Sequence, residues 1–254
     1  MSGSKGFRFW RGAGLAAAAV VFAGMVFVGC EEEDGDNIVY GRLTDSRDGQ
    51  TYRTVKIGSQ TWMAENLNFN AAGGKCYGDG DSVFHYNEVH GFILPDAEIQ
   101  ANCDTYGRLY DWAAVMGFPS SCNENECEGQ VRKKHRGICP SGWHVPSSAE
   151  WGTLAEYVTY AERRNMAGRK LKSAAGWTAD SGYIPGTDDY GFSTLPGGYG
   201  LDGWFRDIGY KGYWWTTKEF SGGVRRWEMN YQMNTSFAMS GTKAGLNSLR
   251  CVAD

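Results

Sequence analysis

The chain has 254 residues, with 25 Lys and Arg, 29 Asp and Glu, and a formal net charge of −4. Residues 1–29 hold three basic side chains and no acid, so the remainder has 22 basic and 29 acidic residues and a net charge of −7. This acidic balance argues against nucleic acid as a partner. The 36 Gly and the aromatic content of 14% indicate many turns that carry large rings, not a helical bundle.

The N-terminal segment has the pattern of a secretory signal peptide. Lys5, Arg8 and Arg11 precede an uncharged, largely apolar run over residues 12–29. A basic region followed by an apolar region directs export. We therefore expect residues 1–29 to be a leader. A retained membrane anchor is the alternative, although a spanning helix needs about 20 apolar residues.

Residues 27–29 (FVG) and the following Cys30 resemble a bacterial lipobox, which implies that a lipidated Cys30 begins the mature chain. Attached acyl chains hold a protein in a membrane, because each buried methylene contributes about 0.8 kcal/mol. The acids in residues 30–37 form a tether that is similar to the export tag of surface lipoproteins in Bacteroidetes-type bacteria. This resemblance implies a lipid anchor in the bacterial outer membrane and exposure at the cell surface; a plain solvated tether is the alternative.

The cysteines that follow residue 30 number six, an even count in a compartment where thiols oxidise. Six cysteines allow fifteen pairings. A bridge between Cys139 and Cys251 would close the longest of the favoured loops and stabilise the fold by about 4 to 5 kcal/mol in the chain-entropy model. A zinc site is the weaker interpretation, because the sequence has no C-x-x-C pair. Sequence proximity favours Cys76 with Cys103 and Cys122 with Cys127, which leaves Cys139 for Cys251.

Residues 38–254 are expected to form one domain that begins with strands. The Asp-Gly turn in DSRDGQ (45–50) predicts a hairpin into residues 51–58, and residues 61–67 follow as a short strand.

Residues 75–103 are polar, and we expect them to be an irregular loop. His85 and His90 lie in this segment. Metal binding there is the alternative to two ordinary loop histidines.

Two amphipathic helices are predicted in the middle of the chain. The first covers residues 105–117, where apolar side chains recur at helical spacing until Gly117. The second begins at a capping box formed by Ser147 and Glu150. The apolar stripes are Leu109, Trp112, Ala113 and Met116 in the first helix, and Trp151, Leu154, Ala155 and Val158 in the second.

The last third of the chain reads as short strands and glycine-rich loops. The clearest strand candidates are residues 212–220, 225–233 and 247–254. Two helices flanked by β structure give an α+β order.

Several blocks resemble a known family. DGQTYRTVKIGSQTWMAENLNF, GRLYDWAAVM, GICPSGWHVPSSAEW, YGFSTLPGGYG, GYWWTT and SLRCV, from about Gly41 to Val252, are similar to the Fibrobacter succinogenes major paralogous domain. The resemblance implies an exported, often lipid-anchored bacterial protein whose family has no established activity.

A more distant resemblance concerns the fold. GWHVPSSAEW, the glycine-rich aromatic loops and SLRCV are similar in order to blocks of formylglycine-generating (sulfatase-modifying) enzymes. This implies a C-type lectin-like fold with two main helices, short antiparallel strands and long Gly- and aromatic-rich loops, braced by disulfides.

The resemblance also allows copper and calcium to be considered as cofactors, and neither is expected. Cys122 and Cys127 have the spacing of the copper-binding cysteines but precede the GWHVP block, so their order is wrong. The carboxylate and amide triplets of calcium-dependent lectins are absent. Asp188, Asp189 and Asp202 are alternatives for a structural calcium ion, although Asx turns in glycine-rich loops are the favoured explanation.

The stretch 190–215 carries nine aromatic residues among many glycines. Rings with polar neighbours suit a sugar, whose C–H face stacks on the ring. Adjacent Trp214 and Trp215 must point to opposite sheet faces, so at least one belongs to the core. The candidate ligand-binding residues are Trp204, Tyr199, Asp202 and Tyr210, with Trp204 expected in a loop.

The sequence contains no convincing catalytic set. Glu150 is used by the helix cap, Glu156 belongs to the outer helix face, and His144 reads as a structural residue. We therefore expect a surface-anchored, non-catalytic binding or adhesion module whose partner is extracellular polysaccharide or another envelope protein. The alternatives are an enzyme with a formylglycine-generating-like fold but different chemistry, and a structural envelope protein.

Overall fold

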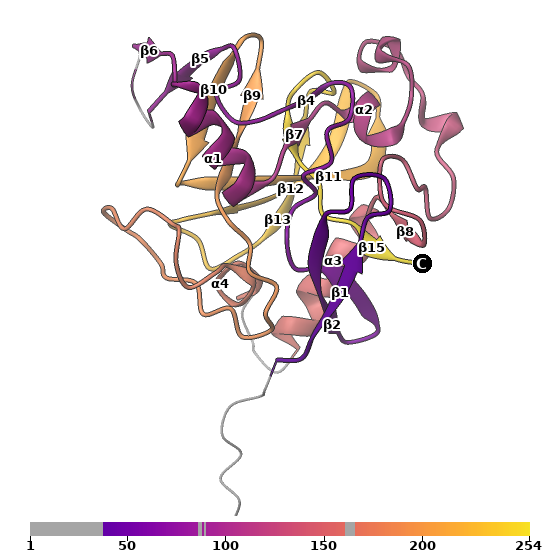
Figure 1. Cartoon of the computed structure of the whole chain (residues 1–254). Coiled ribbons are helices and arrows are strands. Elements are labelled where there is room, and N and C mark those ends of the chain that lie inside the picture. The colour runs from indigo at the N-terminus through magenta and orange to yellow at the C-terminus, as the bar shows by residue number, and fades with distance from the viewer. Residues whose placement is uncertain (1–37, 86–87, 89, 161–165) are drawn as a thin grey trace, which may run out of the picture. The chain divides into compact units, whose positions relative to one another are not determined.

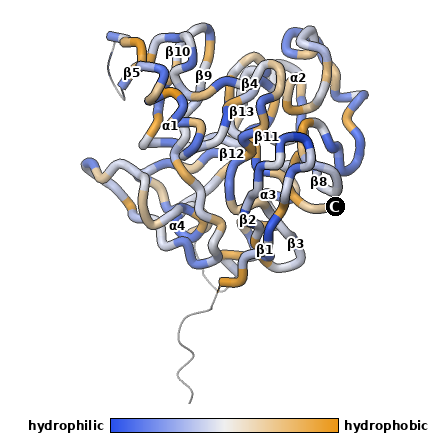
Figure 2. The backbone as a smooth tube through the Cα atoms, viewed as in Figure 1, coloured by the Kyte–Doolittle hydropathy of each residue, from blue (hydrophilic) through white to orange (hydrophobic). Residues whose placement is uncertain are grey.

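The structure is a computed structural model that describes residues 38–85, 88, 90–160 and 166–254 (Figure 1). The predicted leader, Cys30 and the acidic tether lie outside the described residues. Within the described ranges, no helix is long and apolar enough to cross a membrane. Residues 38–254 form one compact unit. Figure 2 shows hydrophobic and hydrophilic residues alternating over short stretches along this unit, as its short elements require.

A five-stranded sheet contains the predicted hairpin. The Asp48-Gly49 turn, with Gly49 at φ 77°, lets the strands pair with Thr44 opposite Thr51. The hairpin is therefore confirmed, whereas the short strand predicted over residues 61–67 ends at Met63. The sheet order is β1 (Tyr40–Thr44), β2 (Thr51–Ile57), β3 (Gln60–Met63), β15 (Val252–Ala253) and β8 (Trp143–His144).

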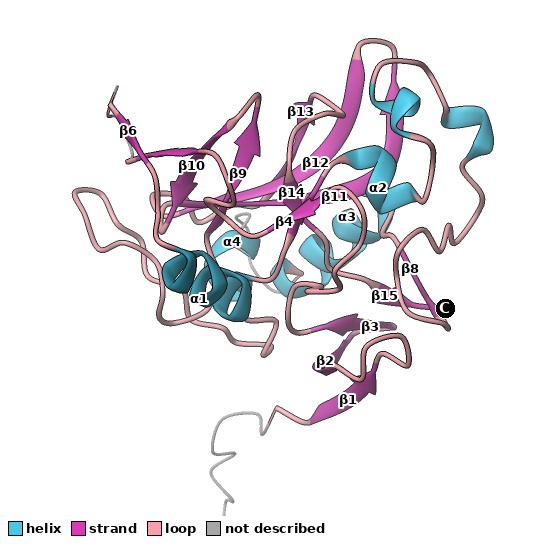
Figure 3. Cartoon of the chain, turned by 45° about the horizontal axis from the view of Figure 1, so that its top comes forward, coloured by secondary structure: helices cyan, strands magenta, loops and turns pink. Residues whose placement is uncertain are grey.

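The second sheet has ten strands, most of them short (Figure 3). Its longest strand, β11, pairs with β12 antiparallel, and β13 pairs with β12 beyond it. Its main path is β4 (Gly74–Lys75), β7 (Leu109–Tyr110), β14 (Asn247–Ser248), β11 (Lys211–Phe220), β9 (Gly197–Leu201), β10 (Trp204–Ile208), β5 (Ser82–Phe84) and β6 (Gly91–Phe92), with β12 (Gly223–Asn230) and β13 (Phe237–Gly241) branching from β11.

The helices are few. The two longest are α1 (Asp96–Tyr106) and α3 (Ser148–Thr159), and α2 (Trp112–Met116) and α4 (Ala167–Leu171) have five residues each. Two 3₁₀ turns, η1 (Ser120–Asn123) and η2 (Glu128–Gln130), follow α2. Together with the two sheets, these helices give a mixed α+β architecture.

The predicted start of α3 is confirmed. The Ser147 hydroxyl accepts from the Glu150 backbone N–H, and the Glu150 carboxylate accepts from the Ser147 backbone N–H at 2.8 Å. The buried side chains of the helix are Trp151, Leu154 and Val158.

The predicted helix over residues 105–117 is wrong at its start. Gly107 adopts φ 74° and ends α1, and residues 109–110 form strand β7. A new N-cap at Asp111, whose carboxylate accepts from Ala114 N at 2.8 Å, then begins the short α2. Its end at Gly117, in the left-handed region, is as predicted.

Three further corrections concern the polar segment and the late strands. Residues 75–103 are not all loop, because they contain β5, β6 and most of α1. Residues 225–233 are strand only to Asn230, where β12 ends. Residues 247–254 form two two-residue strands in different sheets, since the chain turns between Ser248 and Val252.

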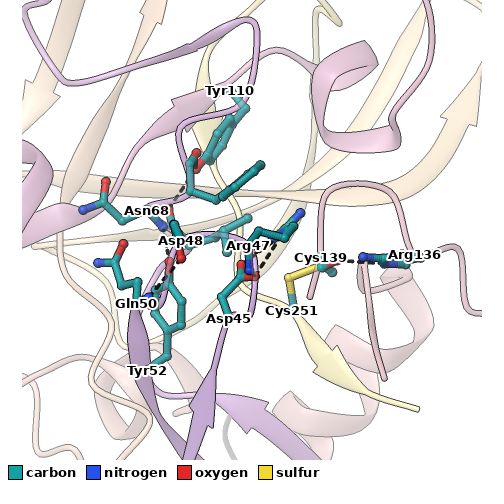
Figure 4. Close-up of polar contacts among 12 residues, drawn as sticks. Asp45, Arg47, Asp48, Gln50, Tyr52, Asn68, Tyr110, Arg136, Cys139 and Cys251 are labelled. Atoms are coloured by element: carbon teal, nitrogen blue, oxygen red, sulfur yellow. Dashed lines mark hydrogen bonds and ion pairs between the residues drawn. A yellow bond between two sulfur atoms is a disulfide. The ribbon is translucent and has the colours of Figure 1, made fainter. Parts of the chain in front are cut away.

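All three favoured disulfides are present. Cys76 bonds to Cys103, Cys122 to Cys127, and Cys139 to Cys251. The last bridge holds residue 251, beside β15, against the segment that leads into β8, and Figure 4 shows it next to Arg136.

A group of tryptophans fills the core between α3 and the sheets. The rings of Trp62 and Trp151 lie 4.9 Å apart, and Trp151 stacks on Trp227 at 5.6 Å with an interplanar angle of 11°. Trp214 joins this group, whereas Trp215 packs in a separate cluster around Trp112. Both adjacent tryptophans are therefore core, one on each side of β11.

Candidate functional site

Strands β9 and β10 place Tyr199 and Trp204 on one sheet face. The two-residue loop of this hairpin is Asp202-Gly203, and both residues have positive φ, 49° and 80°, as a type I′ turn requires. In the resulting register Arg206 lies opposite Tyr199. Because cross-strand partners and alternate residues share a face, all three side chains lie together. Trp204 is thus the first residue of a strand, not a loop residue.

Strands β11 and β12 extend this face with Tyr213 and Arg226. The Tyr199 ring lies 5.4 Å from the Trp204 ring and 5.2 Å from the Tyr213 ring, both edge to face. The Arg226 guanidinium carbon lies 4.1 Å from the centre of the Tyr213 ring and 5.5 Å from that of Tyr199. We call Tyr199, Trp204, Arg206, Tyr213 and Arg226 the aromatic–arginine face.

Arg206 lies between two rings. Its guanidinium carbon is 4.7 Å from the centre of the Phe84 ring and 5.4 Å from that of Trp204. Such cation–π contacts hold the side chain in place without using its N–H donors. Phe84 comes from β5, which pairs with β10 in parallel.

Two buried acids, Asp207 and Glu228, adjoin this face at Tyr213. The Tyr213 hydroxyl donates to Asp207 Oδ2 at 2.9 Å, and Lys211 Nζ lies 3.3 Å from the same oxygen. Burial raises the pKa of Tyr213 and of Glu228, the residue opposite Tyr213 in β12. The basic side chains therefore lie on the rings, and the buried acids adjoin Tyr213.

The sequence-predicted ligand residues separate into two groups. Tyr199 and Trp204 are half-buried and in contact, and Asp202 is exposed in the adjoining turn. Tyr210 lies between β10 and β11, and its ring packs edge to face on Tyr231 at 5.1 Å, as part of the tryptophan core. Sequence reasoning missed Phe84 and Arg226, since only strand register brings them to this face.

Two of the three acids considered for calcium have local partners. Asp188 accepts hydrogen bonds from the backbone N–H of Ser193 at 2.7 Å and from its hydroxyl at 2.5 Å, and Asp189 lies 3.9 Å from Lys170. Among the described residues, no group of three or more His, Cys, Asp or Glu side chains is placed to share a metal ion. The His85 ring lies 4.7 Å from Phe92.

His144 links α3 to the end of the five-stranded sheet. Its Nδ1 lies 2.8 Å from Asp254 Oδ1, and its Nε2 lies 2.8 Å from Glu150 Oε1. The ring is buried, and both nitrogens have carboxylate partners, so it is suited to a structural role. Burial lowers the pKa of His144, but the two hydrogen bonds outweigh it and raise the pKa overall. Burial likewise raises the pKa of Glu150, and the bonds from His144 and Ser147 outweigh it and lower that pKa.

These shifts predict a pH-dependent contribution to stability. A raised His144 pKa stabilises the fold fully below about pH 6.5, the pKa of an unfolded histidine, and less as pH rises through the folded value. The stabilisation from the lowered Glu150 pKa is present above the ordinary pKa of a carboxyl group and is lost as the pH falls through the folded value. His144→Gln should therefore lower the free energy of unfolding by about 2 kcal/mol or more at pH 6 and by clearly less at pH 9. Urea unfolding at the two pH values measures this difference.

The control for this experiment is His90→Gln, because His90 is exposed. That variant should show no such difference between the two pH values. An equal loss at both pH values for His144→Gln would contradict the charged arrangement of His144, Glu150 and Asp254.

The fold and the site together define a disulfide-crosslinked α+β domain with a face of rings and guanidinium groups. The family model of the Fibrobacter succinogenes major domain matches residues 55–253, most of the described chain. The chain therefore belongs to this family. No curated protein and no solved structure matches it.

Proposed function

We propose that this protein is a lipid-anchored lipoprotein of the bacterial outer membrane that binds extracellular polysaccharide, without catalysis, through its aromatic–arginine face. The basic and apolar leader and Cys30 support the anchor. The fold proposed for the domain is C-type lectin-like; two longer helices, short strands, long glycine-rich loops and the bridge between Cys139 and Cys251 support it.

The observation that carries the proposal is the half-exposed ring pair Tyr199 and Trp204 between Arg206 and Arg226. A sugar can stack its apolar face on such a ring while charged donors bind its oxygens. Arginines on both sides favour a polysaccharide that carries carboxylates over a neutral one.

The partial exposure of the rings supports this proposal over a purely structural role. Burial of all the rings of residues 190–215 would have favoured a structural envelope protein with no small ligand. Four of the nine, Tyr190, Tyr199, Trp204 and Tyr210, keep part of their surface exposed.

The test is retention of the oxidised protein, starting at Glu31, on insoluble polysaccharides and on a glycan array. We expect acidic polymers such as polygalacturonate to retain the parent, and Trp204→Ala to weaken binding about tenfold or more. Tyr160→Ala is the matched control, because Tyr160 is 93% exposed and lies at the end of α3. Retention of the parent on no polymer, or equal retention of Trp204→Ala, would refute the proposal.

A further inference from the structure

A cavity of about 670 Å³ lies apart from the aromatic–arginine face. Its walls come from β2, the segment after β3, the end of α1, the loop after α4 and the residue before Cys251. Gln50, Tyr52 and Asn68, which lie near one another in Figure 4, are among its lining residues. The volume lies within the range of small-molecule sites, about 300 to 1,000 Å³. Other lining residues include Asn66, Thr105, Ser173, Ala175 and Arg250, and the charged Arg53, Glu65 and Asp104.

Arg250 forms part of the wall and is 1% exposed. Its Nε and Nη2 both donate to Asn66 Oδ1, at 3.2 and 3.1 Å. Nη1 donates to the Phe192 carbonyl, and Nη2 also donates to the Ser193 carbonyl at 3.5 Å. Four of the five guanidinium N–H donors are thus used, which leaves one on Nη1.

All the acceptors around Arg250 are neutral. Among the described residues no carboxylate forms an ion pair with it, and the nearest acids act only at a distance. Asp188 is bound to Ser193, and Glu65 is paired with Arg53 through a 2.8 Å contact. Burial accordingly lowers the pKa of Arg250 to about 9. A buried charge without a counter-ion is costly, so an anion beside it would be stabilised.

The surroundings hold this cation in one orientation. Trp214 Nε1 donates to Asn66 Oδ1 at 2.8 Å, and Asn66 Nδ2 donates to the Tyr106 carbonyl at 2.8 Å. The Asn66 oxygen therefore faces Arg250, and the guanidinium also lies 4.6 Å from the Phe192 ring centre. Fixed donors of this kind lose little entropy when a ligand binds.

We propose that this cavity binds a small polar molecule with one carboxylate, which Arg250 neutralises. Two charged lining residues, Arg53 and Glu65, pair with each other, and a third, Asp104, is exposed. The buried Arg250 donates only to neutral acceptors, and this one charge matches a single negative charge better than a phosphate, which carries about −1.5 to −2. The other wall groups, Gln50, Thr105 and Ser173, supply hydroxyl and amide partners for the rest of the molecule.

Titration calorimetry of the full chain, with its disulfides intact, tests this proposal. We expect galacturonate, lactate or an amino acid to bind with a dissociation constant of about 1 mM or below, and galactose at least tenfold more weakly. Comparison of the three acids distinguishes a sugar acid, an organic acid and an amino acid as the source of the carboxylate. Binding of inorganic phosphate alone, or of no acid, would overturn the proposal.

Variants then locate the binding. Ala175→Trp fills the cavity from its rim and should weaken binding about tenfold or more, whereas Ala174→Trp, next to it but outside the lining, should not. Arg250→Lys keeps the positive charge but loses the planar set of guanidinium N–H donors. The affinity should therefore fall while the preference for acids over galactose remains. Equal binding by Ala175→Trp and the parent would overturn the site even if the Arg250 variant fails to fold. Trp204→Ala should bind the acid normally, which separates this site from the polysaccharide face.

Discussion

Replacing Cys139 and Cys251 together by alanine is expected to lower the free energy of unfolding by about 5 kcal/mol. The bridge joins residues 112 positions apart, and both sulfurs are fully buried. In the chain-entropy model the stabilisation grows with the length of the loop that the bridge closes. Without the bridge, the unfolded chain gains freedom, and β15 loses its covalent hold. Guanidinium unfolding of the oxidised parent and the double variant measures the difference.

The other two bridges provide a graded control. The same relation gives about 3.5 kcal/mol for Cys76 with Cys103, which are 27 positions apart, and about 2 kcal/mol for Cys122 with Cys127, 5 positions apart. The three double alanine variants should follow this order. Equal losses for all three, or the largest loss for the shortest loop, would contradict an effect on the unfolded chain.

The second large effect is expected at the ion pair of Lys243 and Glu219. The two side chains are 8% and 2% exposed, and Glu219 Oε2 also accepts from the Cys127 backbone N–H at 2.9 Å. Lys243→Met leaves the buried Glu219 carboxylate with no counter-ion and should lower the free energy of unfolding by about 3 to 5 kcal/mol. Chemical unfolding at neutral pH measures this loss.

Two further variants test the cause of that loss. Lys243→Met combined with Glu219→Gln removes the orphan charge but keeps an acceptor for Cys127, so it should recover at least half of the lost stability. Lys218→Met breaks the exposed pair with Glu128, whose side chains are 53% and 50% exposed, and should cost no more than about 1 kcal/mol. If the double variant is no more stable than Lys243→Met, the isolated charge is not the cause.

The elements with strong local signals could be predicted from the sequence. The Asp48-Gly49 turn and the Ser147 capping box each involve groups a few residues apart, so the hairpin and α3 appeared where expected. Helix α1 was missed because it carries no apolar stripe, and Cys103 is its one buried residue. Pro95 followed by acids at positions 96 and 98 was the signal that could have found its start.

The sites show the same division between local and long-range information. The rings of Tyr199 and Trp204 could be selected because they lie near each other in the sequence. Arg226 reaches Tyr199 only through the pairing of β11 with β12, and Asn66 meets Arg250 across 184 positions. Register and such distant contacts depend on how the whole core packs, which periodicity does not encode.

The position of β15 constrains the order in which the fold can be completed. Val252 pairs with Trp62 on one side and with His144 on the other, so this interior strand of the first sheet joins residues that are 190 and 108 positions apart in the chain. Contacts this distant along the chain make folding slow. Until β15 is in place, β8 has no neighbour in this sheet, so the N-terminal hairpin and β8 stay unjoined.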